Sequence, residues 1–169
     1  MSSEFLETAN GARISKSATI HGFKFVAISA GSTINHGAVL HGEPTGADNK
    51  IARTIDIGKA VFIDSKAQIY PPKLGMKIGS YTMVGPSSVV KSAYVGSRVL
   101  IEANCQLGVN SVVNEGCIIR DNTVIPDKMV IPSFTEVQGK AGVDWQCTPL
   151  APGYKKAIEQ QALMRQLIG

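Results

Sequence analysis

The sequence predicts an all-β fold: a single-stranded left-handed parallel β-helix, shaped as a triangular prism of about seven coils, with a C-terminal α-helix. Three features of the chain predict this fold. A branched aliphatic residue recurs at every sixth position, a mostly small residue stands four positions after it, and a turn-forming residue often stands three positions after it. A step of six residues keeps side chains on one face of a strand but not on one face of a helix.

The six-residue period is uninterrupted in the second half of the chain, where each repeated position is Val, Ile or Leu. The series is Val95, Ile101, Leu107, Val113, Ile119, Ile125, Ile131 and Val137. An ordinary β-meander does not keep a fixed period of this length, whereas the hexapeptide β-helix does. Its left-handed sense comes from this known architecture, because ordinary parallel crossovers are right-handed.

The residues between these aliphatic positions fit the corners of a three-sided coil. The positions that supply the turn are Asn104, Asn110, Gly116 and Asn122, which tolerate positive φ. The positions that share the narrow interior near a corner are Val99, Cys105, Ser111, Cys117, Thr123, Met129 and Thr135. Both sets support a coil with little interior space at its corners.

Three hexads form one coil of about 18 residues, so aliphatic residues 18 apart are expected to stack in columns. Val95, Val113 and Ile131 form one such column, and Leu107 and Ile125 belong to another. The same pattern occurs earlier with interruptions, at Ile14, Ile20, Ile28, Ile34, Leu40, Ile57, Ile63, Ile69, Ile78, Val84 and Val90. Residues 43–54 and 71–77 are rich in Gly, Pro and Asp, and are predicted to be loops that protrude at corners.

The chain divides into an N-terminal cap at residues 1–13, the β-helix at 14–139, and an irregular segment with a helix at 140–169. The helix is predicted over about residues 154–167, where Tyr154, Ile158 and Ala162 form one row and Leu163 and Leu167 form another. We expect this helix to lie along one flank of the prism. Phe5 and Leu6 are expected to cover the first coil, whose open edge would otherwise pair with another chain.

Composition limits the classes of function. The chain has a net charge of +4, but its Lys and Arg residues are scattered, which argues against nucleic-acid binding. It contains no apolar run of the roughly 20 residues that span a bilayer, and its first residues do not resemble a signal peptide. Three cysteines without a CxxC pair favour a reducing, cytoplasmic location.

Candidate reactive residues are few. His21, His36 and His41 each follow an aliphatic position closely, so they are interpreted as surface or corner residues, and His36 and His41 could approach one another. Two histidines without a third ligand make a poor zinc site. Cys105 and Cys117 fall on different walls and are interpreted as core residues, and Cys147 as a free thiol.

The acidic pairs Asp121 with Asn122 and Asp56 with Asp64 are interpreted mainly as turn and flank residues. The basic residues could form a contact surface or could serve solubility, and the sequence leaves both readings open. These basic residues are Lys73, Lys77, Lys91, Arg98 and Arg120.

Several segments resemble the dynactin subunit 5 family of small pointed-end proteins. The resemblance rests on EFLETANGARISK at residues 4–16, on Tyr-Pro-Pro at 70–72, and on residues 77–139, which include DNTVIP and VIPSFT. It implies a non-enzymatic scaffold subunit, without cofactors, that caps the pointed end of an actin-like filament in the cytoplasm and associates with the cytoskeleton. The implied partners are dynactin subunit 6, the actin-related pointed-end protein, dynactin subunit 4 and dynein cargo adaptors, with no direct membrane insertion.

A more distant resemblance connects the chain with γ-class carbonic anhydrases. By this alignment their zinc-binding histidines fall at Tyr70, Pro86 and Lys91, none of which supplies a neutral imidazole. The resemblance therefore predicts no catalytic zinc. The alternative function is a hexapeptide-repeat enzyme, either an acyltransferase or a γ-carbonic anhydrase-like protein.

Function on a rigid scaffold is often carried by protruding loops and their neighbours. We therefore predict a protein-interaction surface in the two loops and near the former zinc positions. The candidate residues are Glu43, Asp48, Lys50, Arg53, Tyr70, Lys73, Lys77, Lys91, Tyr94 and Arg98.

Overall fold

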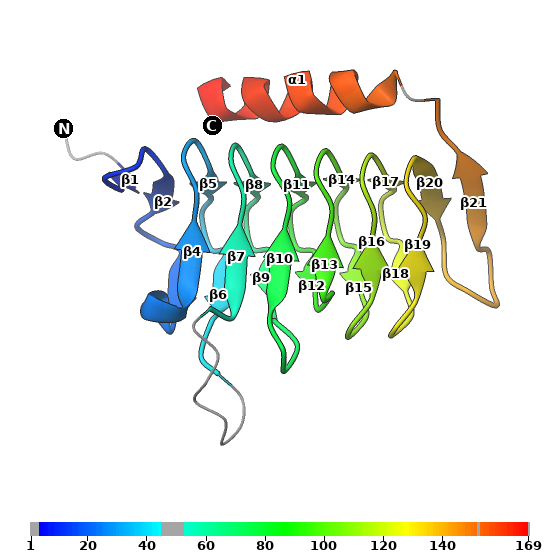
Figure 1. Cartoon of the computed structure of the whole chain (residues 1–169), viewed down its shortest axis with the longest axis horizontal. Coiled ribbons are helices and arrows are strands. Elements are labelled where there is room, and N and C mark those ends of the chain that lie inside the picture. Colours follow the sequence, from blue (N-terminus) through cyan, green and yellow to red (C-terminus); the bar gives the residue numbers. More distant parts are fainter. Residues whose placement is uncertain (1–3, 45–52, 152, 169) are drawn as a thin grey trace.

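The computed structural model describes residues 4–44, 53–151 and 153–168, and they form a left-handed parallel β-helix with one long helix beside it (Figure 1). Three sheets form the walls of the prism. Two of them have six strands each, so the chain completes six coils and begins a seventh with β20. Asp48 and Lys50, named above as interaction candidates, lie outside the described residues.

The strands are short, and their positions in the three walls follow strictly from chain order. Wall A consists of β1 (Phe5–Glu7), β2 (Arg13–Ser15), β5 (Thr33–Ile34), β8 (Phe62–Ile63), β11 (Met83–Val84), β14 (Leu100–Ile101), β17 (Ile118–Ile119), β20 (Thr135–Gln138) and β21 (Gln146–Pro149). Wall B consists of β3 (Thr19–His21), β6 (Val39–His41), β9 (Gln68–Ile69), β12 (Val89–Val90), β15 (Gln106–Leu107) and β18 (Val124–Ile125). Wall C consists of β4 (Val26–Ile28), β7 (Ile55–Ile57), β10 (Met76–Ile78), β13 (Tyr94–Val95), β16 (Val112–Val113) and β19 (Val130–Ile131).

The predicted aliphatic columns are confirmed in each wall. Val95 pairs with Val113 in parallel register, and Val113 pairs with Ile131. Leu107 lies in the same way between Val90 and Ile125. These side chains are buried in one continuous core cluster, and backbone N–H groups of one coil donate to carbonyls of the next, as from Leu100 to Cys117 at 2.9 Å. Side-chain stacking and backbone pairing therefore use the same register.

The corners have the predicted conformation. Asn104, Asn110 and Asn122 all have φ near +60°. The small residues beside them are buried, and the hydroxyl groups among them are paired. Ser88 Oγ donates to the Glu102 carbonyl at 2.8 Å, and Thr82 Oγ1 donates to the Gly96 carbonyl at 2.6 Å. A serine or threonine at a corner thus adds a hydrogen bond between coils without leaving a buried polar group unpaired.

Antiparallel strands cover wall A at both ends of the prism. β1 pairs with β2, so the N-terminal segment covers the first coil mainly through its backbone, and the Leu6 side chain stays exposed. The segment after Gly139, expected to be irregular up to the helix, contains β21, which pairs with β20. Neither strand has a six-residue period, because each forms a single antiparallel pair at an end. Lys77, expected in a loop, lies within β10.

Helix α1 (Tyr154–Ile168) packs along wall A, as expected for a flank helix (Figure 1). Ile158 and Ala162 are buried against Phe62, Met83 and Ile118, which are outward-facing residues of that wall. The second predicted row, Leu163 and Leu167, is exposed instead. The helix has a narrow contact face because it rests on a single flat sheet.

We predict that Leu107→Ala lowers the free energy of unfolding by about 2–5 kcal/mol, because it removes a buried link of the wall B column. Gln106→Ala changes the neighbouring, exposed residue of the same strand and is expected to cost about 0.5 kcal/mol or less. Urea denaturation of both variants measures the difference. Equal effects of the two substitutions would contradict the stacked core.

Candidate interaction surface

The turns between walls form three edges that run along the prism. The B–C edge is formed by the turns that connect each wall B strand to the following wall C strand. In the described residues it carries Phe23 and Lys24 in the first coil, Glu43 and Arg53 in the second, Lys73 and Leu74 in the third, Lys91 in the fourth, Val109 in the fifth, and Asp127 and Lys128 in the sixth. In Figure 1 these turns lie along the lower border, opposite α1.

Most of the predicted interaction residues meet at this edge. Glu43, Arg53, Lys73 and Lys91 lie on it directly, and Tyr70 lies where wall B reaches it. Lys77 and Tyr94 face outward as register partners on the adjoining wall C. Residues from three consecutive coils and two walls are therefore brought together.

Arg98 lies elsewhere, on the C–A edge beneath the helix. Its Nε donates to Glu159 Oε2 at 2.7 Å, its Nη1 lies 3.6 Å from Glu115 Oε1, and its guanidinium covers the Tyr81 ring. These contacts hold α1 against wall A. In this arrangement the side chain serves packing of the chain on itself.

The sequence reasoning did not identify Phe23, Lys24, Leu74, Val109 or Lys128 as parts of this surface. The coil period could have found one of them, because Val109 stands 18 positions after Lys91, which the sequence analysis names as an interaction candidate. Phe23 and Leu74 belong to turns of irregular length, so spacing alone does not place them. Their exposure in the structure is what identifies them.

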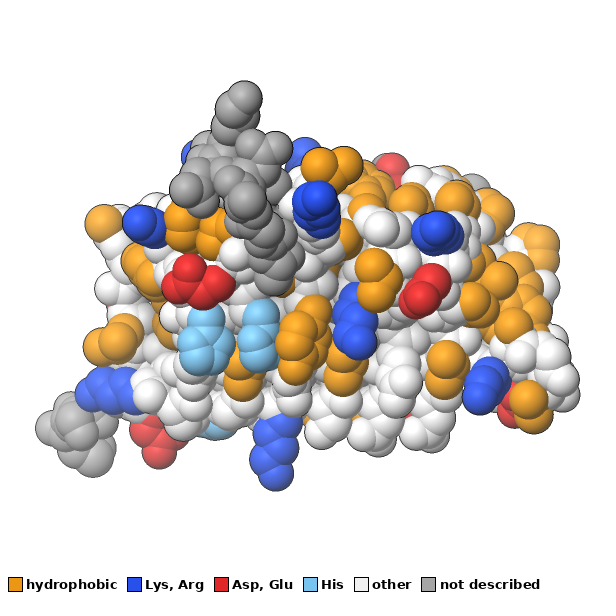
Figure 2. Space-filling model, turned by 90° about the horizontal axis from the view of Figure 1, so that it is seen from below, with side chains coloured by type: hydrophobic (Ala, Val, Ile, Leu, Met, Phe, Trp, Pro, Cys, Tyr) orange, Lys and Arg blue, Asp and Glu red, His pale blue; other side chains and the backbone are white. Residues whose placement is uncertain are grey.

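A stack of rings borders the B–C edge on wall B. His21 and His41 are register partners with ring centroids 5.5 Å apart, and His41 stacks on Tyr70 at 4.0 Å. The Lys91 ammonium lies 5.6 Å from the Tyr70 ring centroid. Figure 2 shows the two histidines side by side on this face. From the sequence His41 could have approached His36, but in the structure it pairs with His21, because both occupy the same outward position in adjacent coils.

His36 has a separate environment on the A–B edge. Its Nδ1 lies 2.8 Å from Ser15 Oγ, and its Nε2 lies 3.5 Å from Glu4 Oε2. The Phe5 ring lies 5.2 Å away. This histidine therefore ties β1 and the start of the chain to the second coil.

The three positions aligned with the zinc-binding histidines of γ-class carbonic anhydrases do not bring metal ligands together in the structure. Tyr70 stacks on His41 and donates its hydroxyl to Gln68 Oε1 at 2.6 Å, and the nearby Lys91 contributes a positive charge. Pro86 has no ligand atom in its side chain and lies on the A–B edge, across wall B from the other two. In the part of the chain that the structure describes, no three His, Cys, Asp or Glu side chains are grouped to hold a metal ion. These residues therefore do not fit a catalytic zinc.

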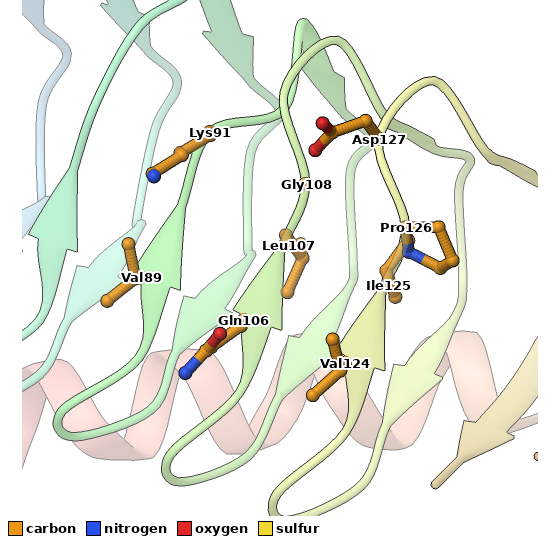
Figure 3. A pocket seen from close by; sticks show the side chains of 9 residues that line it. All are labelled: Val89, Lys91, Gln106, Leu107, Gly108, Val124, Ile125, Pro126 and Asp127. Carbon is orange, nitrogen blue, oxygen red and sulfur yellow. The ribbon is translucent and has the colours of Figure 1, made fainter. Parts of the chain in front are cut away.

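A shallow groove of about 550 Å³ continues along wall B beyond the rings (Figure 3). Val89, Gln106 and Val124 line it as outward-facing register partners on β12, β15 and β18. Gly108 also lines it, and a Cβ at this position would meet the Asp127 backbone nitrogen at 2.5 Å. The close approach of the next coil thus requires glycine there, and Lys91 lies at one end of the resulting groove.

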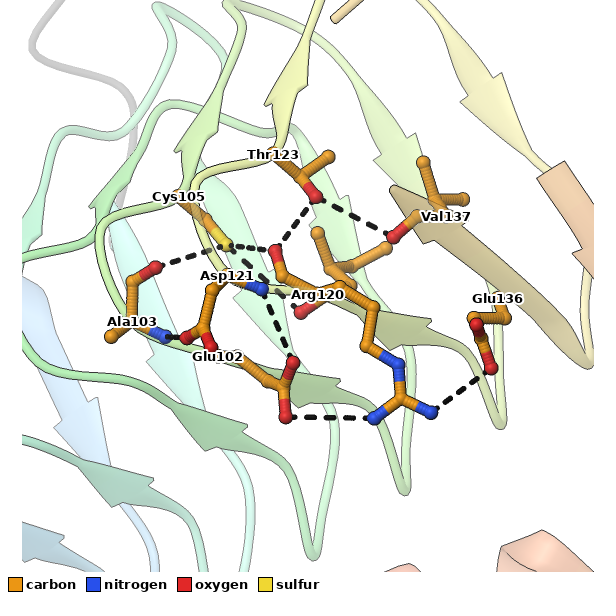
Figure 4. Close-up of polar contacts among 9 residues, drawn as sticks. Glu102, Ala103, Cys105, Arg120, Asp121, Thr123, Glu136 and Val137 are labelled. Carbon is orange, nitrogen blue, oxygen red and sulfur yellow. Dashed lines mark hydrogen bonds and ion pairs between the residues drawn. The ribbon is translucent and has the colours of Figure 1, made fainter. Parts of the chain in front are cut away.

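On the other two edges several arginines and carboxylates are paired, whereas the structure gives no ion pair with a described residue for Lys16, Lys59 and Lys66. On the A–B edge, Arg120 lies 3.0 Å from Glu136 and 3.6 Å from Glu102, while Glu102 and Asp121 accept backbone N–H groups (Figure 4). Asp64 on the same edge accepts from Arg165 of α1 at 2.6 Å. On the B–C edge the structure gives no ion pair with a described residue for any of the basic side chains, which are Lys24, Arg53, Lys73, Lys91 and Lys128.

Cysteine chemistry is restricted by burial. Burial raises the pKa of the Cys105 and Cys117 thiols to about 11, so both are protonated at neutral pH. Cys147 is exposed on β21. All three cysteines are unpaired, as the sequence predicts.

Among the described residues, no helix has the length and apolarity needed to cross a bilayer.

We predict that a disulfide thiol reagent at about pH 8 modifies only Cys147 in the folded chain, since the other thiols are buried and protonated. The reagent should modify all three cysteines after denaturation. Counting the released chromophore measures this difference, and Cys147→Ser is the control that should abolish the native signal. Rapid labelling of Cys105 or Cys117 in the native protein would contradict the structure.

We also predict that acidification weakens the fold through His41. Burial lowers the pKa of His41 from its ordinary 6.5, a hydrogen bond with Gln68 opposes this, and His21 lowers it further. The unfolded chain therefore takes up this proton first, and stability falls as the pH drops from about 7 to about 5. His41→Phe keeps a ring beside Tyr70 and should remove this part of the pH dependence.

Denaturation across that pH range and an NMR titration of the imidazole resonances together check the prediction. A His41 midpoint at or above 6.5 would disprove it.

Comparisons with solved structures agree on the fold. A hexapeptide transferase family protein from Anaplasma phagocytophilum is similar with a TM-score of 0.69 and 14% identity, over 97% of this chain and 95% of that chain. A point mutant of AntD, an N-acyltransferase from Bacillus cereus in complex with dTDP and coenzyme A, is similar with a TM-score of 0.54 and 12% identity, over 96% and 98% of the two chains. At this identity the likeness concerns the fold alone. No curated protein matches the chain in a sequence search.

A match to a protein-family model is more specific. The model described as dynactin subunit 5 matches residues 1–151, which include the whole prism, the ring stack and the B–C edge, and end before α1. The chain therefore belongs to the dynactin subunit 5 family.

Proposed function

We propose that the chain is a non-enzymatic scaffold subunit of the pointed-end complex of dynactin. In this role it caps the actin-like filament and helps dynein engage adaptors and membrane cargo in the cytoplasm, in association with the cytoskeleton. Its proposed neighbours are dynactin subunit 6, the actin-related pointed-end protein and dynactin subunit 4. The family match over residues 1–151 is the observation that carries the proposal.

The physical character of the prism supports a binding role. Its walls are fixed by buried aliphatic columns and by hydrogen bonds between coils, so a partner meets a preorganised surface. Binding to such a surface costs little ordering entropy. The α1 helix covers the outer face of wall A, which leaves walls B and C and the B–C edge as the broad surfaces available for contact.

The site chemistry supports the same role. Tyr70, Pro86 and Lys91 replace the metal ligands expected at a zinc site of this fold, and the buried cysteines are held as thiols. The enzyme alternative rests on the resemblance of the fold to acyltransferases at 12–14% identity. Folds of this kind carry many functions, so that resemblance gives no specific support to an activity.

Affinity purification of the tagged full chain from its own cells tests the assignment. We expect the other pointed-end subunits to co-purify with it in fixed ratio, because a scaffold subunit works by staying bound to its neighbours. A tagged acyltransferase of the same fold is the control and should recover none of them. Recovery of a homotrimer without these partners would reject the proposal.

A thermal-shift measurement separates the scaffold from the enzyme. We expect neither acetyl-CoA nor Zn²⁺ to raise the melting temperature of the purified chain, since ligand binding to the native state would stabilise it. A saturable increase with either ligand would favour the enzyme alternative instead.

A further inference from the structure

We infer that β3, the strand of wall B in the first coil, is a docking site for an extended segment of a partner protein. The segment pairs with β3 through its backbone and places an aliphatic side chain next to an aromatic ring. This inference rests on the proposed scaffold function and specifies the kind of segment that one end of the prism takes. It is carried by the free edge of β3, by the incompletely covered core at that end, and by the ring stack that begins there.

β3 has one free edge, because in the described residues it pairs with β6 alone and wall B ends with it. The Thr19 N–H donates to the Ala38 carbonyl at 2.9 Å, and the His21 carbonyl accepts from the Gly42 N–H at 2.9 Å. These groups therefore point toward the second coil. Successive backbone groups of a strand point to opposite sides, so the N–H and C=O of Ile20 point to the free edge. Such an edge is a template for pairing with another chain.

The antiparallel strand at this end of the prism covers a different wall. β1 pairs with β2 in wall A and lies one strand beyond the first coil (Figure 1). A complete coil of a second β-helix would add a strand to all three walls and would meet β1 in wall A. A single extended segment needs only wall B, so it fits at the level of β1 without displacing it.

The core is incompletely covered at the same end. Ile20 is only partly buried, whereas Leu40 and Ile69, which follow it in the wall B column, are fully buried. A hollow of about 290 Å³ also opens there, lined mainly by apolar side chains of the first coil and by the turn after β1. At the opposite end, Trp145 packs against the core. An aliphatic side chain on an added strand would cover Ile20 on its open side and remove apolar surface from water.

The ring stack on the outer face of wall B also has an open end at β3. An aliphatic residue is followed directly by a ring in three successive coils, at Ile20–His21, Leu40–His41 and Ile69–Tyr70. The His41 ring lies between two others, with centroids 5.5 Å from His21 and 4.0 Å from Tyr70. Among the described residues, His21 has a ring neighbour on one side only. A segment with the same pair of side chains continues both the aliphatic column and the ring stack in one register.

Two other occupants fit this edge less well. A helix bonds its own backbone N–H and C=O groups internally, so it offers none to the free groups of Ile20. The interior of a lipid bilayer has no groups that pair with the edge of a strand. An extended segment supplies backbone donors and acceptors together with side chains on both faces, which is what β3 leaves without partners.

A short synthetic peptide, Thr-Thr-Tyr-Ile-Tyr-Thr-Thr, provides the probe, and its symmetric order allows pairing in either strand direction. An NMR titration of the purified full chain should give saturable shifts at Ile20 and His21 and slower exchange of the Ile20 N–H. The control peptide has the same side chains but carries methyl groups on the backbone nitrogens of its three central residues. It should bind at least about fivefold more weakly, because it cannot donate to the edge. Equal binding of the two peptides, or no binding of the unmodified one, would overturn the inference.

Variants of the chain localise the site. His21→Ala removes the exposed ring at the open end of the stack, and it should weaken binding of the unmodified peptide about fivefold or more. His21→Tyr keeps a ring at this position and should preserve the affinity. Gln106→Ala changes an exposed residue on an interior strand of the same wall and should leave the affinity unchanged. Equal affinities of the His21→Ala and Gln106→Ala proteins would contradict docking at β3.

Size-exclusion chromatography of the chain without peptide forms a second arm. A dimer that His21→Ala dissociates would replace the partner segment by a second copy of the chain and would overturn the inference. Affinity purification separates the inference from the proposed function. If the unmodified chain recovers the pointed-end subunits but does not bind the peptide, only the inference fails. If it binds the peptide but recovers none of these subunits, only the proposed function fails.

Discussion

The structure depends on one constraint, the stacking of branched aliphatic side chains in register with the hydrogen bonds between coils. Ile101 pairs with Ile119 in wall A, and the Glu102 N–H donates to the Ile119 carbonyl at 2.8 Å beside them. A shift of one residue would turn the aliphatic side chains outward and break the corner conformations at the same time. Packing and backbone pairing therefore select the same arrangement of coils. This arrangement fixes the spacing of the turns and outward-facing strand residues from one coil to the next.

That fixed spacing turns the edges into ordered rows. Each coil contributes one turn to each edge, so the identity of a turn residue determines what the surface presents at that step. On the A–B edge the row contains charges that pair with neighbouring coils or with α1, as Arg120 and Asp64 do. On the B–C edge the described residues leave the lysines unpaired and expose apolar side chains. The two edges share a backbone and differ in their arginines and carboxylates, which are paired at several points of the A–B edge, while lysines on both edges have no ion pair with a described residue.

The sequence predicted those parts of the fold that repeat. The columns through Val95 and Leu107, the left-handed φ of Asn104 and Asn122, and the helix after Gly153 all follow from local pattern. It did not predict β21, because an antiparallel strand at the end of a prism has no period. It also did not predict that His41 pairs with His21, and suggested only that His36 and His41 could approach one another. Separation in sequence is a poor guide where the coils set the distance: His21 and His41 are 20 positions apart but are register partners.

The sequence predicted only part of the candidate surface, because the coils bring its residues together and separation in sequence does not show this. Lys73 was named from its predicted loop and Lys91 from its place at an aligned zinc position. What joins them in the structure is the B–C edge, which also contains Phe23 and Lys128 from opposite ends of the prism. The Tyr70–Lys91 contact belongs both to the aligned zinc positions and to the B–C edge. The alignment with γ-class carbonic anhydrases predicts zinc-binding histidines at Tyr70 and Lys91, and in the structure these two side chains border the B–C edge. The outward side chains at these positions can therefore differ between proteins of this fold without any change to the aliphatic columns behind them.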